Sequence, residues 1–186
     1  SDLKDMSISG SGEVILVGNG VTSGRITFDG DMTVALVNVN IVNKATPITV
    51  AGGKVTFELF GENWLKVETA SYSALYNAAG TTVTLCGAGT LVAKGGLRAA
   101  GIGGGENAAG DIVIEGGKIE ATSESSGAGI GSGYNGTCGD VTISGGEVMA
   151  RGGLGGAGIG SGNGSQAVCG KITISGGVVV AEGGEG

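Results

Sequence analysis

The chain has 186 residues, of which 43 are glycine and one is proline, and its formal net charge at pH 7 is −7. Collagen needs glycine at every third position, which this sequence lacks, and a proline-rich linker needs far more proline. Without a cluster of basic residues the chain has no surface suited to nucleic-acid phosphates, and without a run of about 18 apolar residues it has no membrane-spanning helix. We therefore expect neither nucleic-acid binding nor membrane insertion.

Short segments that alternate apolar and polar residues begin near the N-terminus and predict half-buried strands. Residues 6–16 form one such unit, with a Ser-Gly-Ser-Gly turn inside it. Two further pairs each recur one short coil later: Ile26 and Phe28 with Ile48 and Val50, and Val34 and Leu36 with Val55 and Phe57. This spacing predicts short, less regular coils over residues 1–99.

From residue 55 onward the spacing between equivalent residues lengthens, and three apolar columns recur. The first column contains Val55/Phe57, Val83/Leu85, Ile112/Ile114, Val141/Ile143 and Ile172/Ile174. The second contains Leu65, Leu91, Ile119, Val148 and Val179, with Ala93, Ala121, Ala150 and Ala181 beside it. The third contains Leu75, Ile102, Ile130 and Ile159. Three inward columns predict three sheets around one core, because stacked parallel strands place equivalent side chains above one another.

Residues 100–186 contain three copies of one glycine-rich unit, each with a Gly-Ile-Gly segment followed by two alternating segments. No single unit can bury its own apolar face, whereas stacked units can. The sequence therefore predicts one all-β domain over 1–186, a single right-handed parallel β-helix (a solenoid) with three sheets and roughly six to seven coils of about 21–31 residues.

The same segments resemble the glycine-rich repeat region of secreted and cell-surface proteins of bacteria. Residues 127–133 with 140–150, and 156–162 with 171–181, carry the Gly-Ala-Gly-Ile-Gly-Ser-Gly and strand-Ile-Ser-Gly-Gly-strand pattern of that family. The resemblance implies a β-helix in a secreted or cell-surface, extracellular setting, with a general association with adhesion or carbohydrate recognition. It implies no particular catalytic residues.

The residue types argue against catalysis. The chain has no histidine, and Cys86 lacks the base that would activate a thiol. Asp111 and Asp140 occupy equivalent turn positions, but Lys171 takes the third place, so the paired carboxylates of a glycosidase are not assembled. A calcium ion between the two aspartates is weighed against solvated turn acids, and the latter is favoured because the calcium-binding nonapeptide repeat is absent. We expect no enzyme activity, no cofactor and no metal.

The cysteines carry a sharper prediction. Cys138 and Cys169 each lie two residues before the equivalent positions 140 and 171, so they are expected in neighbouring coils, within disulfide distance. A Cys138–Cys169 bridge would fit an oxidising extracellular compartment. The alternative is a pair of reduced cysteines that fill a turn. Cys86 has no cysteine at an equivalent position and is expected to be a free thiol.

The few aromatic residues indicate where a ligand would bind. Alternation places Trp64 and Tyr76 on the outer surface, Tyr76 beside the bare backbone of later Gly-Ile-Gly segments. Their rings could stack on a sugar, with Asn63 and Lys66 as polar neighbours and Tyr72 nearby. The alternative is that Trp64 and Tyr72 only cover the loop between Lys66 and Ser73.

The sequence thus favours a non-catalytic extracellular module of a bacterial surface or secreted protein that binds a glycan or a surface protein. A purely structural stalk or spacer is the alternative, and a polysaccharide lyase or hydrolase is more remote. Both ends of a β-helix expose strand edges, so end-to-end self-association is expected at the glycine-rich C-terminus.

Overall fold

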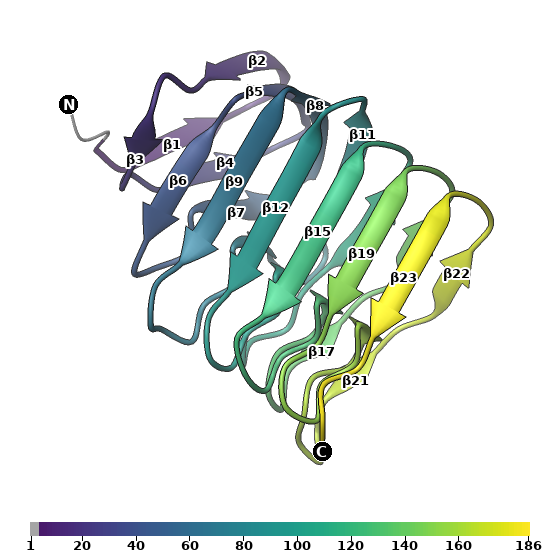
Figure 1. The fold of residues 1–186 in the computed structure, drawn as a ribbon. Coiled ribbons are helices and arrows are strands. Elements are labelled where there is room, and N and C mark those ends of the chain that lie inside the picture. The colour runs from purple at the N-terminus through teal and green to yellow at the C-terminus, as the bar shows by residue number, and fades with distance from the viewer. Residues whose placement is uncertain (1–3) are drawn as a thin grey trace.

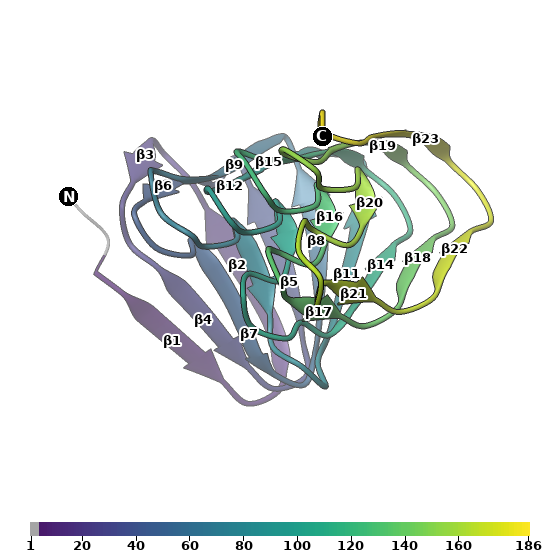
Figure 2. The same cartoon turned by 90° about the horizontal axis from the view of Figure 1, so that it is seen from below.

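The computed structural model describes residues 4–186, and every regular element in this part is a β-strand (Figure 1). The described part accordingly has no helix that could cross a membrane. Three sheets of seven parallel strands wind around one axis as a right-handed β-helix (Figures 1 and 2). The predicted fold class is confirmed.

Each sheet takes one strand from every coil. Sheet A contains β1 (Met6–Ser9), β4 (Ile26–Asp29), β7 (Ile48–Gly52), β10 (Leu75–Asn77), β13 (Ile102–Gly103), β16 (Ile130–Gly131) and β20 (Ile159–Gly160). Sheet B contains β2 (Gly12–Val17), β5 (Met32–Val37), β8 (Lys54–Phe60), β11 (Thr82–Gly87), β14 (Asp111–Ile114), β18 (Val141–Ile143) and β22 (Ile172–Ile174). Sheet C contains β3 (Val21–Thr22), β6 (Asn40–Asn43), β9 (Glu62–Val67), β12 (Thr90–Gly95), β15 (Lys118–Ser123), β19 (Glu147–Arg151) and β23 (Val178–Glu182).

The chain passes through sheets A, B and C in that order, so each sheet receives one strand per coil and there are seven coils. The coils lengthen along the chain: Met6 pairs with Ile26 in the first coil, whereas Ile130 pairs with the more distant Ile159 near the C-terminus. The last two coils contain an additional strand at the corner between sheets A and B, β17 (Thr137–Cys138) and β21 (Val168–Cys169), which pair only with each other.

The core consists of aliphatic columns, as the alternation predicts. The register stacks Val55, Val83, Ile112, Val141 and Ile172 in sheet B, and Leu75, Ile102, Ile130 and Ile159 in sheet A. Phe28 and Phe57 meet edge to face in the N-terminal part of the core, with their centroids 5.6 Å apart. Burial of each such side chain stabilises the fold by about 1.5–3 kcal/mol.

Two predicted alignments are wrong by two positions. Leu65 pairs with Ala93, not Leu91, because the offset that pairs Thr82 with Lys54 in sheet B continues unchanged into sheet C. Val34 pairs with Phe57, not Val55, and a β-bulge that adds one residue to β7 lengthens this coil before the chain reaches sheet B. Both errors shift the register by two residues. Because side chains alternate with a period of two, the inward and outward faces remain as predicted.

The repeated Ser-Gly-Gly or Glu-Gly-Gly motif forms the corner between sheets B and C. The second glycine of each motif has a positive φ, 86° at Gly117 and 84° at Gly146 and Gly177. A Cβ at Gly146 would also lie 2.6 Å from the carbonyl oxygen of Gly117 in the preceding coil. The corner therefore needs glycine both for its conformation and for the close stacking of coils.

Candidate functional site

A depression lies on the outer face of sheet A, over the N-terminal coils. It is a groove of about 660 Å³. Outward side chains of three successive strands form its floor, since Tyr76 pairs with Thr49 and Thr49 with Thr27. The remaining lining comes from Met6 at the start of β1 and from the loops beside these strands: Asp5, Arg25, Ala45, Thr46, Ser71, Tyr72, Ser73, Gly105, Glu106 and Asn107.

The two tyrosines give the groove its aromatic surface. Tyr72 lies in the loop before β10 and is 51% exposed, so its ring is accessible. Tyr76 is half-buried, and its hydroxyl donates a hydrogen bond to the carbonyl oxygen of Ala108, 3.0 Å away, in the loop of the next coil. Burial raises the pKa of Tyr76, so the phenol remains a donor at neutral pH.

Beyond Tyr76 the outer column of sheet A carries no side chains. Gly103, Gly131 and Gly160 continue it. A Cβ at Gly131 would lie 2.0 Å from the carbonyl oxygen of Gly160, so this part of the sheet must stay bare. All three glycines are buried, so the exposed glycine backbone that the sequence predicts beside Tyr76 is not found.

Ser73 lines the groove, but its hydroxyl points into the protein. The residue is only 2% exposed, and its hydroxyl oxygen is buried without a hydrogen-bond partner in the described part of the chain. A buried hydroxyl without a partner costs about 1–3 kcal/mol, and this one is closed off from a ligand in the groove.

Charges at the groove occur as ion pairs. The side chain of Arg25 donates two hydrogen bonds to the carboxylate of Asp5, which also accepts the backbone N–H of Arg25 at 3.1 Å. These hydrogen bonds hold the pKa of Asp5 below its usual value. On the opposite side, Arg98 pairs with Glu106 at 3.2 Å. Both pairs join neighbouring loops and leave the groove without an uncompensated positive charge.

Trp64 and Lys66 lie on a different face, so the five predicted ligand-binding residues do not form one site. Trp64 is 39% exposed on the outer face of sheet C, and the ammonium of Lys94 lies 5.7 Å from its ring centroid. Lys66 and Lys94 border a second depression of about 570 Å³ where the strands of sheet C end, with Glu68, Thr122 and Glu124. Tyr72 and Tyr76 belong to the sheet A groove instead.

Asn63 must be removed from the candidate ligand-binding residues. It is completely buried in the inward column that holds Leu91 and Ile119 in later coils. Its amide oxygen accepts the backbone N–H of Val39 at 2.9 Å, and its amide nitrogen donates to the carbonyl oxygens of Phe60 and Thr90 at 3.2 and 3.1 Å. Strand alternation turns Asn63 inward while its neighbour Trp64 points outward, so Asn63 cannot contact a ligand on the outer face.

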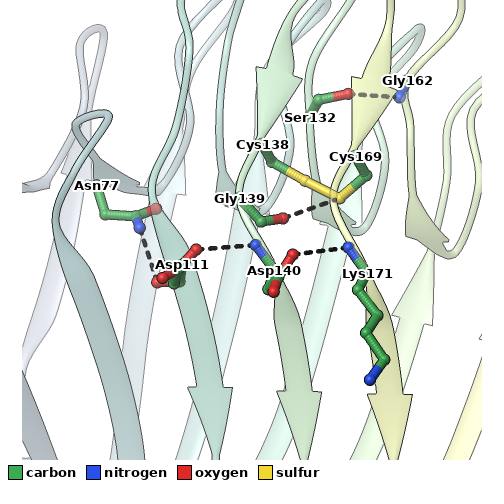
Figure 3. Close-up of a disulfide and its surroundings, with 9 residues drawn as sticks. All are labelled: Asn77, Asp111, Ser132, Cys138, Gly139, Asp140, Gly162, Cys169 and Lys171. Atoms are coloured by element: carbon green, nitrogen blue, oxygen red, sulfur yellow. Dashed lines mark hydrogen bonds between the residues drawn. A yellow bond between two sulfur atoms is a disulfide. The ribbon is translucent and has the colours of Figure 1, made fainter.

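The structure contains the Cys138–Cys169 disulfide (Figure 3). The two cysteines are register partners in β17 and β21, with their Cα atoms 4.6 Å apart. Cys86 is a free thiol on β11, and burial, with Glu58 and Glu115 nearby, raises its pKa. A protonated, half-buried thiol is a poor nucleophile.

The turn aspartates next to the disulfide serve as acceptors for the following coil. Asp111 accepts the backbone N–H of Asp140 at 2.9 Å, and Asp140 accepts that of Lys171 at 2.7 Å (Figure 3). Asp31 makes the same contact with Lys54 at 2.8 Å. Each aspartate therefore joins two coils, and residues 4–186 contain no cluster of three potential metal ligands.

Four stretches of the chain match one family model, described as a beta helix repeat: residues 83–106, 112–134, 141–163 and 172–186. The C-terminal part of the chain is a β-helix repeat region. Each full β-helix repeat begins in sheet B, crosses sheet C and ends just after the next strand of sheet A. Comparisons with curated proteins and with solved structures give no match.

Sequence reasoning missed most of the groove. Thr27 and Thr49 were detectable, because each is the outward residue between two inward apolar residues of a predicted strand. The Asp5–Arg25 pair was also detectable, since each residue directly precedes the first inward residue of a coil, Met6 or Ile26. Glu106 carries no such signal, because its loop reaches the groove only through the three-dimensional path of the chain.

Proposed function

We propose that this chain is a non-catalytic, extracellular module of a bacterial surface or secreted protein, and that it binds a neutral glycan in the sheet A groove. The observation that carries the proposal is the placement of the accessible Tyr72 ring beside Tyr76 and the outward Thr27 and Thr49 in one groove. An aromatic ring offers a face to the C–H groups of a sugar, and hydroxyl groups match the sugar's own donors and acceptors.

The charge distribution supports a neutral ligand. Arg25 is paired with Asp5, and Glu106 with Arg98, so neither a free cation for an acidic sugar nor a free carboxylate for an amine faces the groove. The net charge of −7 would also repel a polyanion at low ionic strength. A neutral oligosaccharide needs no charged partner in the groove and is not repelled by the net charge of the chain.

The non-catalytic and extracellular parts of the proposal have separate support. Asp111 and Asp140 each hold a backbone N–H of the next coil, and an acid used in this way is poorly placed to transfer protons to a substrate. The Cys138–Cys169 disulfide favours an oxidising compartment, because cytosolic thiols are kept reduced.

The test is a glycan array followed by calorimetry with the intact chain. Tyr72→Ala should weaken binding about tenfold or more, since loss of aromatic contact costs about 1–2 kcal/mol. Trp64→Ala is the matched control, because it removes an exposed aromatic side chain from another face. Loss of binding in the control alone would move the site to sheet C, and binding unchanged by both would exclude both aromatic surfaces.

A structural stalk is the second candidate. It is favoured by the core, which is one continuous aliphatic cluster enclosed by the three seven-stranded sheets, as a rigid spacer needs. A wild-type chain that binds no glycan on the array would support the stalk.

A further inference from the structure

The depression at the end of sheet C, in the middle coils of the molecule, is bordered by charges of both signs. Lys66 and Lys94 lie on its strand side. Glu68 and Glu124 lie on its loop side, directly after β9 and β15 end. In the described part of the chain none of these four side chains forms an ion pair. The outward cations of the later coils of sheet C are paired instead, in Lys118–Glu120, Lys118–Glu147 and Arg151–Glu182.

The two lysines share one side of the sheet C depression because of the strand register. Lys66 and Lys94 are direct partners in neighbouring parallel strands, and both side chains are exposed. Their backbones are therefore about 4.8 Å apart. The ammonium of Lys94 lies 5.7 Å from the ring centroid of Trp64 on β9, so this side chain leans toward the strand of Lys66. Like charges on directly opposed residues repel each other, and an anionic group beside both lysines would relieve this repulsion.

Glu68 continues the outward row that Lys66 begins. The intervening Val67 is buried, and the backbone N–H of Glu68 still donates to the carbonyl oxygen of Asn43 at 2.8 Å. The chain thus keeps its extended path and its alternation as far as Glu68. Two residues of extended strand separate the positions of Lys66 and Glu68 by about 7 Å along the sheet.

The coil between the two glutamates presents no side chain at this level, which opens the depression. Glu68 follows β9 and Glu124 follows β15, whereas the strand between them, β12, ends in Gly95 and is followed by Gly96. A Cβ at Gly96 would collide with the carbonyl oxygen of Ala70, so the close packing of this corner requires glycine. The two carboxylates accordingly flank a gap about two strand spacings wide, on the order of 10 Å.

We propose that the sheet C depression binds a short zwitterionic peptide of about dipeptide length. The peptide carboxylate lies beside the ammonium groups of Lys66 and Lys94. The peptide ammonium lies over the glycine gap, beside the carboxylates of Glu68 and Glu124. Two residues of extended peptide span about 7 Å, which matches the step from Lys66 to Glu68. A depression of about 570 Å³ also leaves room for small side chains.

The charge pattern favours a zwitterion over a simple acid or a simple amine. An anion beside the lysines would face the uncompensated Glu68 and Glu124, and a cation beside the glutamates would face Lys66 and Lys94. Only a ligand with both charges, at separate ends, meets opposite charge at each end. This site lies on a different face from the sheet A groove, and the proposal does not depend on glycan binding there.

The proposal is tested by NMR titration of the intact, ¹⁵N-labelled chain with L-alanyl-L-alanine. Saturable shifts are expected at the amides of Lys94, Gly95 and Gly96, with a dissociation constant in the millimolar range. The N-acetyl form of the dipeptide lacks the ammonium, and its C-terminal amide lacks the carboxylate. Each of these should bind about fivefold more weakly or less, because each loses two exposed ion pairs.

Two variants assign the two ends of the ligand. Lys94→Gln should weaken binding of the dipeptide about threefold and bring its affinity close to that of the dipeptide amide, and Glu124→Gln should do the same relative to the N-acetyl form. Lys54→Gln is the matched control, because it removes an exposed cation from sheet B, and it should leave binding unchanged. Circular dichroism checks that all three variants fold.

Three outcomes would overturn the proposal. The first is the absence of saturable shifts in the wild type up to about 20 mM dipeptide. The second is equal affinity for the dipeptide and its two blocked forms, which would mean that neither charged end is recognised. The third is binding whose shifts lie outside the sheet C depression and which Lys94→Gln and Glu124→Gln leave unchanged.

Discussion

Cys138 and Cys169 bind the sixth coil to the seventh through register-paired strands, with their Cα atoms 4.6 Å apart. They lie at the corner between sheets A and B, in the additional strands β17 and β21 of the last two coils. The disulfide therefore adds a covalent link to the hydrogen bonds that join these two coils.

Removal of this disulfide should loosen the last coil before the rest of the molecule. The bridge joins cysteines with a sequence separation of 31, and loss of such a constraint is expected to cost about 3 kcal/mol. In the Cys138→Ala/Cys169→Ala variant, hydrogen exchange should accelerate in β22 and β23 and change little in β5 and β8. Cys86→Ala is the control and should leave the exchange of β22 and β23 as it is; uniform acceleration in the double variant would contradict local loosening.

Asn63→Leu should destabilise the protein even though leucine occupies the same column at position 91. The substitution leaves the Val39 N–H and the carbonyl oxygens of Phe60 and Thr90 without their buried partner. We expect a loss of about 2–4 kcal/mol in the free energy of unfolding, measured by denaturant titration. A more stable variant would mean that hydrophobic packing outweighs these three hydrogen bonds.

The carboxyl group of Asp5, which pairs with Arg25, should titrate with a pKa below that of an ordinary aspartate. Hydrogen bonds from Arg25 lower the pKa of Asp5 from its usual 3.8. Because the folded-state pKa is the lower one, the pair contributes stability above pH 3.8, and this contribution disappears as the pH falls through the folded-state pKa. Carboxyl ¹³C NMR should give a midpoint below 3.8 that rises in Arg25→Gln. An unchanged midpoint in the variant would exclude Arg25 as the cause.

Gly146→Ala should destabilise the corner between sheets B and C. The residue has a φ of 84°, and the new Cβ would meet the Gly117 carbonyl oxygen at 2.6 Å. Strain of this kind costs about 1–3 kcal/mol. Gly105→Ala is the control, because a Cβ there makes its nearest contact at 3.5 Å, and its melting temperature should match that of the wild type. Equal melting temperatures for both variants would show that the corner can relax.

The alternation of apolar and polar residues was enough to predict three sheets, the inward side chains and the pairing of Cys138 with Cys169. These features depend on side-chain period and on repeat spacing, which are both properties of the sequence. The exact neighbours were harder to predict where the repeats are irregular. The bulge in β7 shifts the register partners of the following strand without changing the inward face, so the pattern contains no sign of it.

The candidate site depended on the tertiary structure. Trp64, Lys66, Tyr72 and Tyr76 lie close together in the sequence, yet the chain turns a corner between β9 and β10 and places them on two faces. Conversely, Asp5, Thr27, Thr49, Tyr76 and Glu106 come from successive coils and meet in one groove. The sequence determined which side chains point outward, because that follows from the two-residue period of a strand. Only the winding of the coils decided which of them share a surface, because neighbours on that surface are one full coil apart along the chain.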